Sequence, residues 1–309
     1  MIKVTLGLCV KNNEETISYV MRSVLKQNYP REYMEIIVVD GFSEDNTLKI
    51  IKRNLCEKGL LVKFLCENVG LGFARQMVVD NASGDYVIWV DGDTVFPQDF
   101  VKRQVKFMDE NSRVGIGRAR YGILQGSNYV AFLENIPFVV ESLRFNEKAP
   151  LGICGTEGAI YRVEAIKQAG GFDVNIKGAG EDIDLARRIL AMGWEARVTD
   201  AVFYEICKGS WKDLWKQYVW WGYGGHFVFH KTKNFDFLFK MSPLGGFLAG
   251  ILRLPHAFKL SKQKIICLLP LHYAFKRLAY CYGFTKAHIE GYGHQVKNDI
   301  FRKCKRILV

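Results

Sequence analysis

The first hundred residues alternate between two hydrophobic periods. Four short apolar runs are typical of buried strands: residues 2–10, 35–39, 61–66 and 86–90. Three segments between them have helical spacing, the second after an initial turn: residues 14–27, 43–56 and 72–81. Strands that alternate with helices imply βαβ units, so the sequence predicts an α/β fold with a sheet covered by helices on both faces.

The pattern is weaker after residue 100 but predicts further elements. Residues 113–125 and 152–162 have strand character, and residues 129–145 and 180–192 have helical character. The last of these helices begins with acids and continues with bases, which suits the helix macrodipole. We expect an α/β domain over residues 1–205 and a helical region over residues 206–309.

The basic charge of the chain is confined to its last third. Residues 206–309 hold 18 Lys and Arg against 4 Asp and Glu, a net charge of +14; the whole chain of 309 residues carries +11, which leaves −3 for the first 205. Apolar stretches here, such as 243–254, are interrupted by bases and fall short of the roughly 18–20 residues that span a bilayer. This pattern favours an anionic membrane surface over nucleic acid as the partner, with a packed helical subdomain and a solvated basic rim as the alternative.

The cysteines bear on the compartment. The eight cysteines form no CxxC pair, and the chain opens on a strand-like segment without a secretory signal. Together these features predict a reducing, cytoplasmic setting. With the basic region, we expect a peripheral position on the cytoplasmic face of a membrane.

Polar clusters follow three of the predicted strands. They are Lys11-Asn12-Asn13-Glu14, Asp40-Gly41-Phe42-Ser43 and Asp91-Gly92-Asp93. In open α/β sheets, ligands bind outside the carboxyl ends of the parallel strands. We therefore expect the three clusters to converge on one crevice.

Asp91 and Asp93 are the first candidates for chemistry. Two carboxylates just beyond a buried strand cannot enter a core without several kcal/mol of desolvation cost. Hard oxygen ligands of this kind suit Mg²⁺ or Mn²⁺ carried in with a phosphate group. A surface turn with two solvated acids is the alternative.

Other candidates lie upstream of this pair. Asp40 ends a strand, where its carboxylate can accept a hydrogen bond from a nucleobase NH or a ribose hydroxyl, but it can equally serve as a turn or capping residue. Asn13 and Glu14 have a similar alternative, with Asn13 capping the helix that begins near Glu14. Arg75 and Asn68 are candidates for contacts with phosphate or ribose, although an arginine on a helix is more often solvated or ion-paired.

A third group lies at the start of the predicted helix 180–192. Glu181 and Asp182 follow Gly178-Ala179-Gly180, where the absence of side chains permits close approach of another molecule. A carboxylate at a helix N-terminus tends to stay ionised, as a general base must. Favourable first-turn acids are the alternative.

Taken together, the motifs resemble glycosyltransferase family 2, whose members have the GT-A fold. The matching segments occur in order over about residues 2–220: VKNNEETI (10–17), VVDGFSEDNT (38–47), NVG (68–70), ARQ (74–76), ASGDY (82–86), DGD (91–93), GGFD (170–173) and GEDIDL (180–185). As a set they are highly specific. The resemblance implies a Rossmann-like mixed sheet and a nucleotide-sugar-dependent, inverting transferase.

The resemblance also implies roles for individual residues. Asp40 with Asn13 and Glu14 would hold the nucleotide base, and Asp91 and Asp93 would place a divalent metal, Mn²⁺ or Mg²⁺, on the diphosphate. Asp182 would be the general base that deprotonates the acceptor hydroxyl, with Glu181 and Gly180 on the acceptor. The expected donor is a UDP-sugar, with GDP-mannose as an option, and the expected acceptor is a glycan or a polyprenyl-linked group.

The sequence departs from the family at three places. Gly41 and Phe42 replace the usual second Asp and Gly, so Asp40 alone carries the charge of that segment. The family often has a metal-binding His near residues 202–205, which this chain lacks, so His226 or Glu205 would have to substitute. The segment 217–221 lacks the arginine of the QxxRW motif of processive synthases, and no membrane spans are evident, which favours transfer of a single sugar.

Two other functions are compatible with parts of the sequence. Residues 87–95 also resemble the hhhhDxDxT strand of haloacid dehalogenase-type phosphatases, in which Asp91 would be the phosphoryl nucleophile and Asp93 an acid/base. That reading leaves Asn13, Glu14 and Asp40 without a role. A non-catalytic nucleotide-sugar-binding protein is the other alternative, against which the intact Asp91-Gly92-Asp93 and Asp182 argue.

Overall fold

The computed structural model divides into two compact units. It describes residues 1–55, 59–124, 128–145, 151–152, 154–176, 178–233 and 235–295, without the side chains of residues 236 and 237. The first unit comprises residues 1–127, 138–177 and 181–207, and the second comprises 128–137, 178–180 and 208–309. The sequence-based division at 205/206 therefore places two short segments, 128–137 and 178–180, in the N-terminal region, whereas they cluster with the C-terminal helices.

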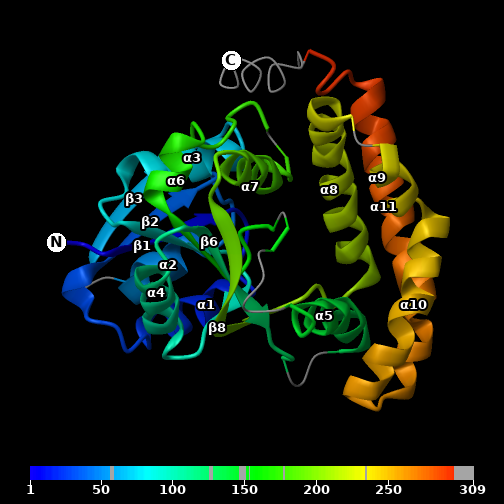
Figure 1. Cartoon of the computed structure of the whole chain (residues 1–309), viewed down its shortest axis with the longest axis horizontal. Coiled ribbons are helices and arrows are strands. Elements are labelled where there is room, and N and C mark those ends of the chain that lie inside the picture. Colours follow the sequence, from blue (N-terminus) through cyan, green and yellow to red (C-terminus); the bar gives the residue numbers. More distant parts are fainter. Residues whose placement is uncertain are drawn as a thin grey trace. The chain divides into compact units, whose positions relative to one another are not determined.

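The first unit is built on an eight-stranded mixed sheet (Figure 1). Its strands are β1 (Val4–Val10), β2 (Met34–Asp40), β3 (Leu61–Cys66), β4 (Tyr86–Val90), β5 (Thr94–Val95), β6 (Val114–Tyr121), β7 (Ala159–Arg162) and β8 (Glu195–Glu205). They lie in the order β3-β2-β1-β4-β7-β6-β8-β5. The first four in this order are parallel, β7 runs antiparallel to both its neighbours, β8 runs parallel to β6, and β5 is antiparallel to β8. This confirms the predicted α/β class and the mixed sheet.

Side chains alternate between two cores, one on each face of the sheet. Leu6 and Leu8 of β1 pack in one core with α1 (Ile17–Leu25), α2 (Thr47–Leu55) and α4 (Phe100–Glu110). Trp89 of β4 packs in the other core, with three helices: α3 (Leu71–Asn81), α6 (Val163–Gln168) and α7 (Glu181–Ala191). Because successive side chains of a strand point to opposite faces, a strand buried on both sides reads as a continuous apolar run. The predicted helices on both faces are confirmed.

Several predicted elements are shorter in the structure, for local reasons. The helix expected from residue 14 begins at Ile17, because residues 12–14 form a turn that hydrogen-bonds to residues 43–47. The strand expected over 152–162 is only Ala159–Arg162, since Gly158 has a φ of +59°, which ends the extended backbone. The helix expected over 129–145 is α5 (Tyr129–Ser142). At the first two of these ends, polar or glycine-rich residues adjoin apolar ones, so hydrophobic periodicity extends the predicted element too far.

The second unit is helical. It contains the first half of α5 and four further helices, α8 (Trp211–Thr232), α9 (Phe235–Lys240), α10 (Pro243–Ser261) and α11 (Leu269–Ile289), with a short 3₁₀ turn at Lys264–Leu268. A Cβ on Gly222 or Gly283 would overlap the backbone of the facing helix, so α8 and α11 pack with their backbones close together. Among the described residues, no helix has both the length and the apolar character to cross a membrane.

A buried ion pair joins three helices of this unit. Glu134 on α5 accepts hydrogen bonds from Tyr218 Oη on α8 and from Lys276 Nζ on α11, both at 2.7 Å. Glu134 and Lys276 are 3% and 2% exposed. An unpaired charge at either buried position would be strongly destabilising, so the ion pair holds the segment 128–137 against the C-terminal helices.

Candidate active site

The ends of β1 and β2 are tied together by hydrogen bonds. The backbone N–H of Asn13 donates to Thr47 Oγ1 at 2.7 Å, and Glu14 Oε2 accepts from both the backbone and the side chain of Asn46 at 3.0 Å. The Glu14 carboxylate thus holds the turn before α2. The structure brings both predicted residues to the β2 side of the sheet edge, with Glu14 engaged in building the turn.

Asp40 ends β2 and is 3% exposed. Its carboxylate accepts two hydrogen bonds from Ser43, one from the backbone N–H at 3.0 Å and one from Oγ at 2.7 Å. A carboxylate has about four acceptor positions, so it retains capacity for another donor. The carbonyl of Asp40 accepts from the N–H of Glu67 at 3.1 Å, and Asn68, the next residue, is exposed.

The cluster after β1 packs directly on Asp91-Gly92-Asp93. A Cβ on Gly92 would lie 2.5 Å from Cγ of Asn13, so only glycine admits the Asn13 amide at this point. Thr16 Oγ1 donates to the Gly92 carbonyl at 2.5 Å. The clusters that contain Glu14, Asp40 and Asp91 are therefore in contact with one another, which confirms the predicted convergence of three strand ends.

Backbone hydrogen bonds fix both aspartates of this motif. Asp91 N–H donates to Thr94 Oγ1 at 3.1 Å, and Thr94 N–H returns a bond to the Asp91 carbonyl at 3.2 Å. The Asp93 carbonyl accepts from the N–H of Ile206 at 2.8 Å. Glu205 pairs with Thr94 in the β5–β8 ladder. Of the two suggested substitutes for the missing histidine, Glu205 is therefore beside the motif, whereas His226 belongs to a histidine cluster of the second unit.

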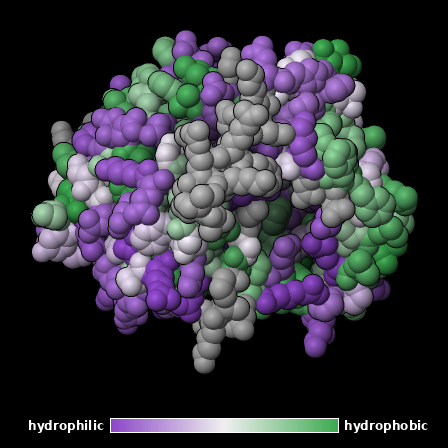
Figure 2. Space-filling model, turned by 45° about the horizontal axis from the view of Figure 1, so that its top comes forward, coloured by the Kyte–Doolittle hydropathy of each residue, from purple (hydrophilic) through white to green (hydrophobic). Residues whose placement is uncertain are grey.

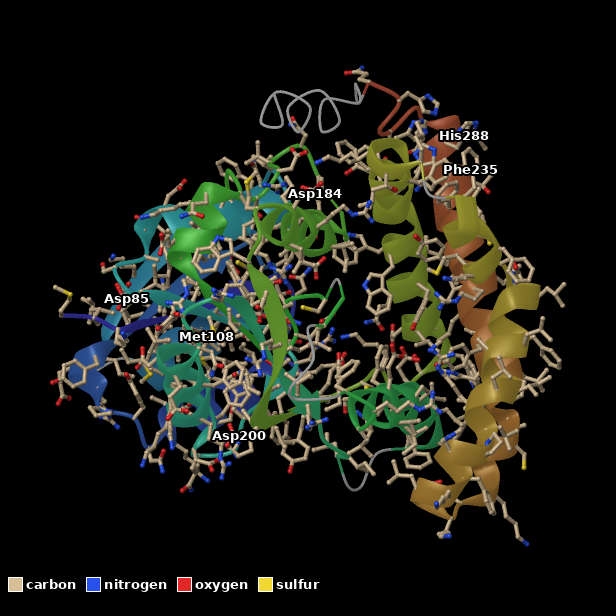
Figure 3. All side chains as sticks on the ribbon, viewed as in Figure 1. Asp85, Met108, Asp184, Asp200, Phe235 and His288 are labelled. Atoms are coloured by element: carbon tan, nitrogen blue, oxygen red, sulfur yellow. The ribbon has the colours of Figure 1, made fainter. Side chains whose placement is uncertain are left out.

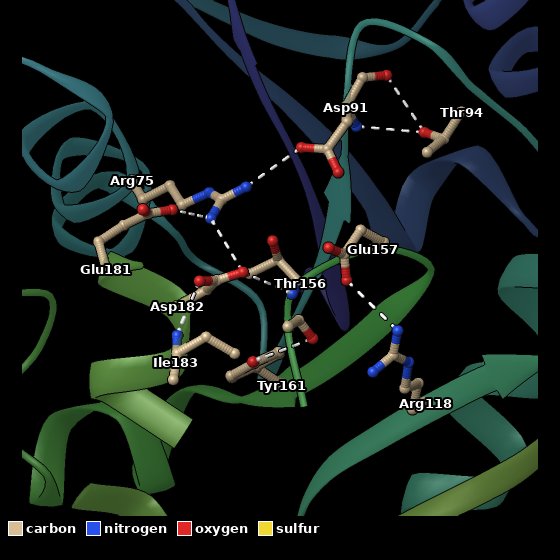
Figure 4. Close-up of polar contacts among 11 residues, drawn as sticks. Arg75, Asp91, Thr94, Arg118, Thr156, Glu157, Tyr161, Glu181, Asp182 and Ile183 are labelled. Carbon is tan, nitrogen blue, oxygen red and sulfur yellow. Dashed lines mark hydrogen bonds and ion pairs between the residues drawn. The ribbon is translucent and has the colours of Figure 1, made fainter. Parts of the chain in front are cut away.

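Arg75 of α3 is the centre of the site (Figure 4). Its side chain is 5% exposed. Nη2 donates to Asp91 Oδ1 at 3.2 Å, while Nη1 pairs with Glu181 and lies 3.9 Å from Asp182 Oδ2. The guanidinium carbon also lies 5.6 Å from the ring centroid of Trp89. The ion-paired alternative for Arg75 is thus what the structure shows: its donors are directed at protein carboxylates.

The start of α7 carries the other acids of the site. Asp182 Oδ1 accepts from the N–H of Ile183 at 2.7 Å, and Oδ2 accepts from the N–H of Thr156 at 3.3 Å. The Asp182 side chain is 14% exposed, whereas Glu181 is 1% exposed and its Oε2 has no hydrogen-bond partner among the described residues. Asp182 is consequently oriented and reachable, while Glu181 is buried beneath it on Arg75.

The structure adds two candidate site residues that the sequence pattern does not indicate, Glu157 and Arg118. A Cβ on Gly155 would lie 2.5 Å from Glu157 Oε2 and 2.8 Å from Asp182 Oδ2, so these two carboxylates face the same point. Arg118 Nη2 lies 3.5 Å from Glu157 Oε2. The polar residues inside the glycine-rich segment 152–162 were the available signal, but the strand prediction gave them no position.

Gly180, a predicted acceptor residue, has a structural reason to be glycine. Its φ is +105°, and a Cβ there would lie 2.6 Å from Cγ2 of Val228. Both residues belong to the second unit. The chain therefore passes from a segment held on α8 directly into Glu181 and Asp182.

The electrostatics of the site fit a divalent cation. Its carboxylates outnumber its guanidinium groups: Asp91, Asp93, Glu157, Glu181 and Asp182 against Arg75 and Arg118. Burial raises the pKa of Asp91 to about 6, with smaller contributions from nearby carboxylates and an opposing one from Arg75. Burial likewise raises the pKa of Glu181 to about 8. An oxygen-rich set with excess negative charge is the donor chemistry that Mg²⁺ and Mn²⁺ prefer.

Comparison with known families identifies the family of this chain. The model of glycosyl transferase family 2 matches residues 5–170, more than half of the chain. The chain belongs to glycosyl transferase family 2. Membership in this family favours a glycosyltransferase and argues against the phosphatase alternative.

Curated relatives of this family 2 glycosyltransferase are distant. Poly-beta-1,6-N-acetyl-D-glucosamine synthase of Staphylococcus aureus is 24% identical over 244 residues, 75% of this chain and 58% of the relative. The corresponding Staphylococcus epidermidis synthase is 26% identical over 228 residues, 72% of this chain and 54% of the relative. The chain spans little more than half the length of these relatives.

Solved structures show the same fold. The mannosyltransferase PcManGT from Pyrobaculum calidifontis, in complex with GDP-Man and Mn²⁺, has a TM-score of 0.63 and 19% identity, with 93% of this chain and 87% of that chain covered. Residues 1–349 of S. aureus TarS, in complex with UDP-GlcNAc, have a TM-score of 0.52 and 17% identity, with 94% and 92% covered. These likenesses confirm the predicted GT-A fold.

Arg75→Met should destabilise the first unit strongly. The substitution removes the buried cation that Asp91, Glu181 and Asp182 share, and removal of one partner of a buried pair costs about 3–5 kcal/mol. The measurement is the free energy of unfolding from urea denaturation. Arg103→Met is the matched control, because Arg103 also pairs with two aspartates, Asp99 and Asp200, but is 46% exposed. Arg103→Met should lower the free energy of unfolding by only a small fraction of the decrease caused by Arg75→Met. Equal decreases in the two variants would contradict the central position of Arg75.

Proposed function

We propose that this glycosyltransferase moves one sugar from a nucleoside diphosphate sugar to a hydroxyl or phosphate of a glycan or polyprenyl-linked acceptor, with inversion at the anomeric carbon. A UDP-sugar is the favoured donor, and GDP-mannose is the second option. The nucleotide would lie over Asn13, Asp40 and Asn68, and the acceptor over Asp182.

A single observation carries this proposal: the guanidinium group of Arg75 contacts both Asp91, the proposed metal ligand, and Asp182, the proposed general base. Arg75 Nη2 bonds to Asp91, and Arg75 Nη1 lies 3.9 Å from Asp182. The two carboxylates are therefore held on neighbouring nitrogens of a rigid, planar group. This spacing supports a diphosphate leaving group at Asp91 and an attacking hydroxyl at Asp182, with the transferred carbon between them.

The chemistry at Asp182 follows from its hydrogen bonds. Thr156 and Ile183 each donate a backbone N–H to the carboxylate, which fixes the direction in which it faces an acceptor. Asp182 would take the proton of the acceptor hydroxyl as the acceptor oxygen bonds to the anomeric carbon. The bond from that carbon to the diphosphate breaks at the same time on the opposite face, which inverts the configuration.

Asp91 and Asp93 would hold the divalent metal. When bound, the metal neutralises the charge that develops on the departing diphosphate. Arg75 keeps one oxygen of Asp91 in place, and the turn through Thr94 fixes its backbone. Glu205, beside this motif, is our candidate for the missing third protein ligand.

The similar structures and relatives support a nucleotide-sugar donor. PcManGT is described with GDP-Man and Mn²⁺, TarS with UDP-GlcNAc, and the curated relatives are N-acetylglucosamine polymer synthases. All of them are distant, so the sugar and the base of the donor are open to experiment.

A thermal-shift screen tests the donor and the metal together. A UDP-sugar should raise the melting temperature in the presence of Mn²⁺ and less so in EDTA, since a ligand at 100 times its Kd stabilises the native state by about 2.7 kcal/mol. Asp93→Asn should lose the Mn²⁺-dependent part of the shift. If no UDP- or GDP-sugar raises the melting temperature, the proposed donor class is wrong.

Asp182→Asn tests the base. The transfer rate should fall by about 10²–10⁴-fold, the usual contribution of a general base, while donor affinity measured by calorimetry stays unchanged. Asp80→Asn is the control, because Asp80 is an exposed acid at the end of α3. Turnover near the wild-type rate in Asp182→Asn would refute the assignment.

The C-terminal helices support contact with an anionic membrane. Leu244, Leu248 and Leu252 are 62%, 44% and 74% exposed and lie four residues apart on one face of α10. Lys259 and Lys262, at the end of this helix, are exposed as well. Figure 2 shows hydrophobic side chains gathered at the right of the molecule, where Figure 1 places α10. An exposed apolar face beside lysines is typical of helices that lie in a membrane interface. The cytoplasmic side of that membrane stays a prediction.

Co-sedimentation with vesicles tests this surface. The protein should pellet with phosphatidylserine-containing vesicles and much less with phosphatidylcholine alone, because the basic charge adds to apolar insertion. The triple variant Leu244→Glu, Leu248→Glu, Leu252→Glu should abolish pelleting. Met192→Glu, at an apolar residue of the first unit that is 50% exposed, should leave it unchanged. Equal pelleting of the triple variant and the wild type would exclude this face.

A further inference from the structure

Four histidines gather at one end of the second unit. His226 and His230 lie one turn apart on α8, His288 lies in the last turn of α11, and His294 follows it. Figure 3 shows His288 at that end of α11. One nitrogen of each ring can be chosen so that all four lie within 4.8 Å of one another. The cluster is separate in chemistry from the Asp91 site, where no histidine is among the described neighbours.

The chain brings these rings together by a tight turn. Gly291 and Gly293 have φ values of +71° and +89°, a conformation that glycine adopts without strain. Between them, Tyr292 stacks on Tyr223 of α8 with ring centroids 4.7 Å apart. This turn reverses the chain after α11 and returns His294 to within 5.0 Å of the His288 and His230 rings.

The protonation state of His226 follows from one hydrogen bond. Its Nδ1 lies 2.6 Å from the carbonyl oxygen of Tyr292, which can only accept, so Nδ1 carries the proton. His226 is 1% exposed. Its Nε2 then carries a lone pair, which faces Nδ1 of His288. A ring nitrogen that donates to a backbone carbonyl while the other faces inward is the usual arrangement of metal-binding histidines.

Three ring nitrogens converge at metal-ligand spacing. His288 Nδ1 lies 3.2 Å from His226 Nε2 and 3.2 Å from His294 Nε2. Two ligands that each lie about 2.0–2.1 Å from a tetrahedral ion are about 3.3 Å apart. The observed nitrogen–nitrogen separations therefore match the spacing of ligands around one such ion. Without an ion, His288 Nδ1 can donate its single proton to only one of these two neighbours at a time. A cation would satisfy all three lone pairs.

We propose that His226, His288 and His294, with His230 as the fourth ligand, bind a Zn²⁺ ion that fastens the end of α8 to the end of α11. Four imidazole nitrogens suit zinc and other late first-row ions, whereas Mg²⁺ and Mn²⁺ prefer oxygen. A site with four protein ligands leaves no open position, which makes it structural.

The ammonium group of Lys233 opposes cation binding at this site. Lys233 Nζ lies 3.3 Å from His230 Nδ1. Lys233 is exposed, so its ammonium group can turn into water when the ion binds. Lys233→Ala should therefore tighten zinc binding, because it removes a like charge.

Metal titration of the full chain without a histidine tag tests the proposal. After dialysis against a chelator, the protein should bind one equivalent of Zn²⁺, rise in melting temperature, and give the visible absorption of tetrahedral Co²⁺ when cobalt replaces zinc. His288→Ala and His294→Ala, at exposed residues, should each weaken zinc binding by at least about 100-fold, more than the loss of an outer-shell partner. His256→Ala is the matched control, at an exposed histidine of α10.

The outcomes are distinguishable from those of the proposed transfer reaction. The double variant Asp91→Asn, Asp93→Asn should keep its zinc, and loss of zinc in that variant would assign the ion to the active site instead. Loss of binding in His294→Ala with an unchanged metal-free melting temperature supports the site. Full zinc affinity in both His288→Ala and His294→Ala, or no stoichiometric zinc in the wild type, would overturn it.

Discussion

The buried guanidinium of Arg75 is the constraint on which the site depends. A charge in this position is stable only with partners, and its partners come from two distant parts of the chain: Asp91 after β4 and Glu181 with Asp182 at the start of α7. The arginine therefore fixes the distance between two groups that the sheet alone would leave independent. Its contact with the Trp89 ring adds a cation–π interaction on the core side.

The same constraint determines the charge of the site. Arg75 compensates part of the negative charge, but Asp93, Glu157 and Asp182 remain near Asp91 and contribute to its raised pKa. A polar group buried with like charges is destabilising until a cation or a ligand compensates it. For the proposed metal and diphosphate, this uncompensated negative charge would lower local stability in the empty site and strengthen binding of the cation.

Sequence periodicity predicted the parts of this site that depend on strand ends. Asp40 and Asp91 each follow an uninterrupted apolar run, and parallel strands bring such ends to one edge. The partners of Arg75 could not be read in this way, because Arg75 and Glu181 are 106 residues apart and no period relates them. Glu157 was missed for a different reason: Gly158 turns the backbone, and a pattern of polarity does not reveal a φ of +59°. Residue types at strand ends are local information, whereas ion-pair partners are set by tertiary packing.

His226 shows how ligand chemistry separates two sites in one chain. In the sequence it was an isolated histidine that could complete a metal site beside Asp91; in the structure its Nδ1 is committed to Tyr292 and its Nε2 faces His288. The Asp91 motif offers oxygen ligands, and the histidine cluster offers nitrogen ligands. Because Mn²⁺ and Mg²⁺ favour the first set and Zn²⁺ the second, the two sites would not compete for one ion. A histidine beside Asp93 would make the active site more attractive to zinc, so its absence is consistent with an oxygen-ligated catalytic metal in a chain that also carries a cluster of imidazoles.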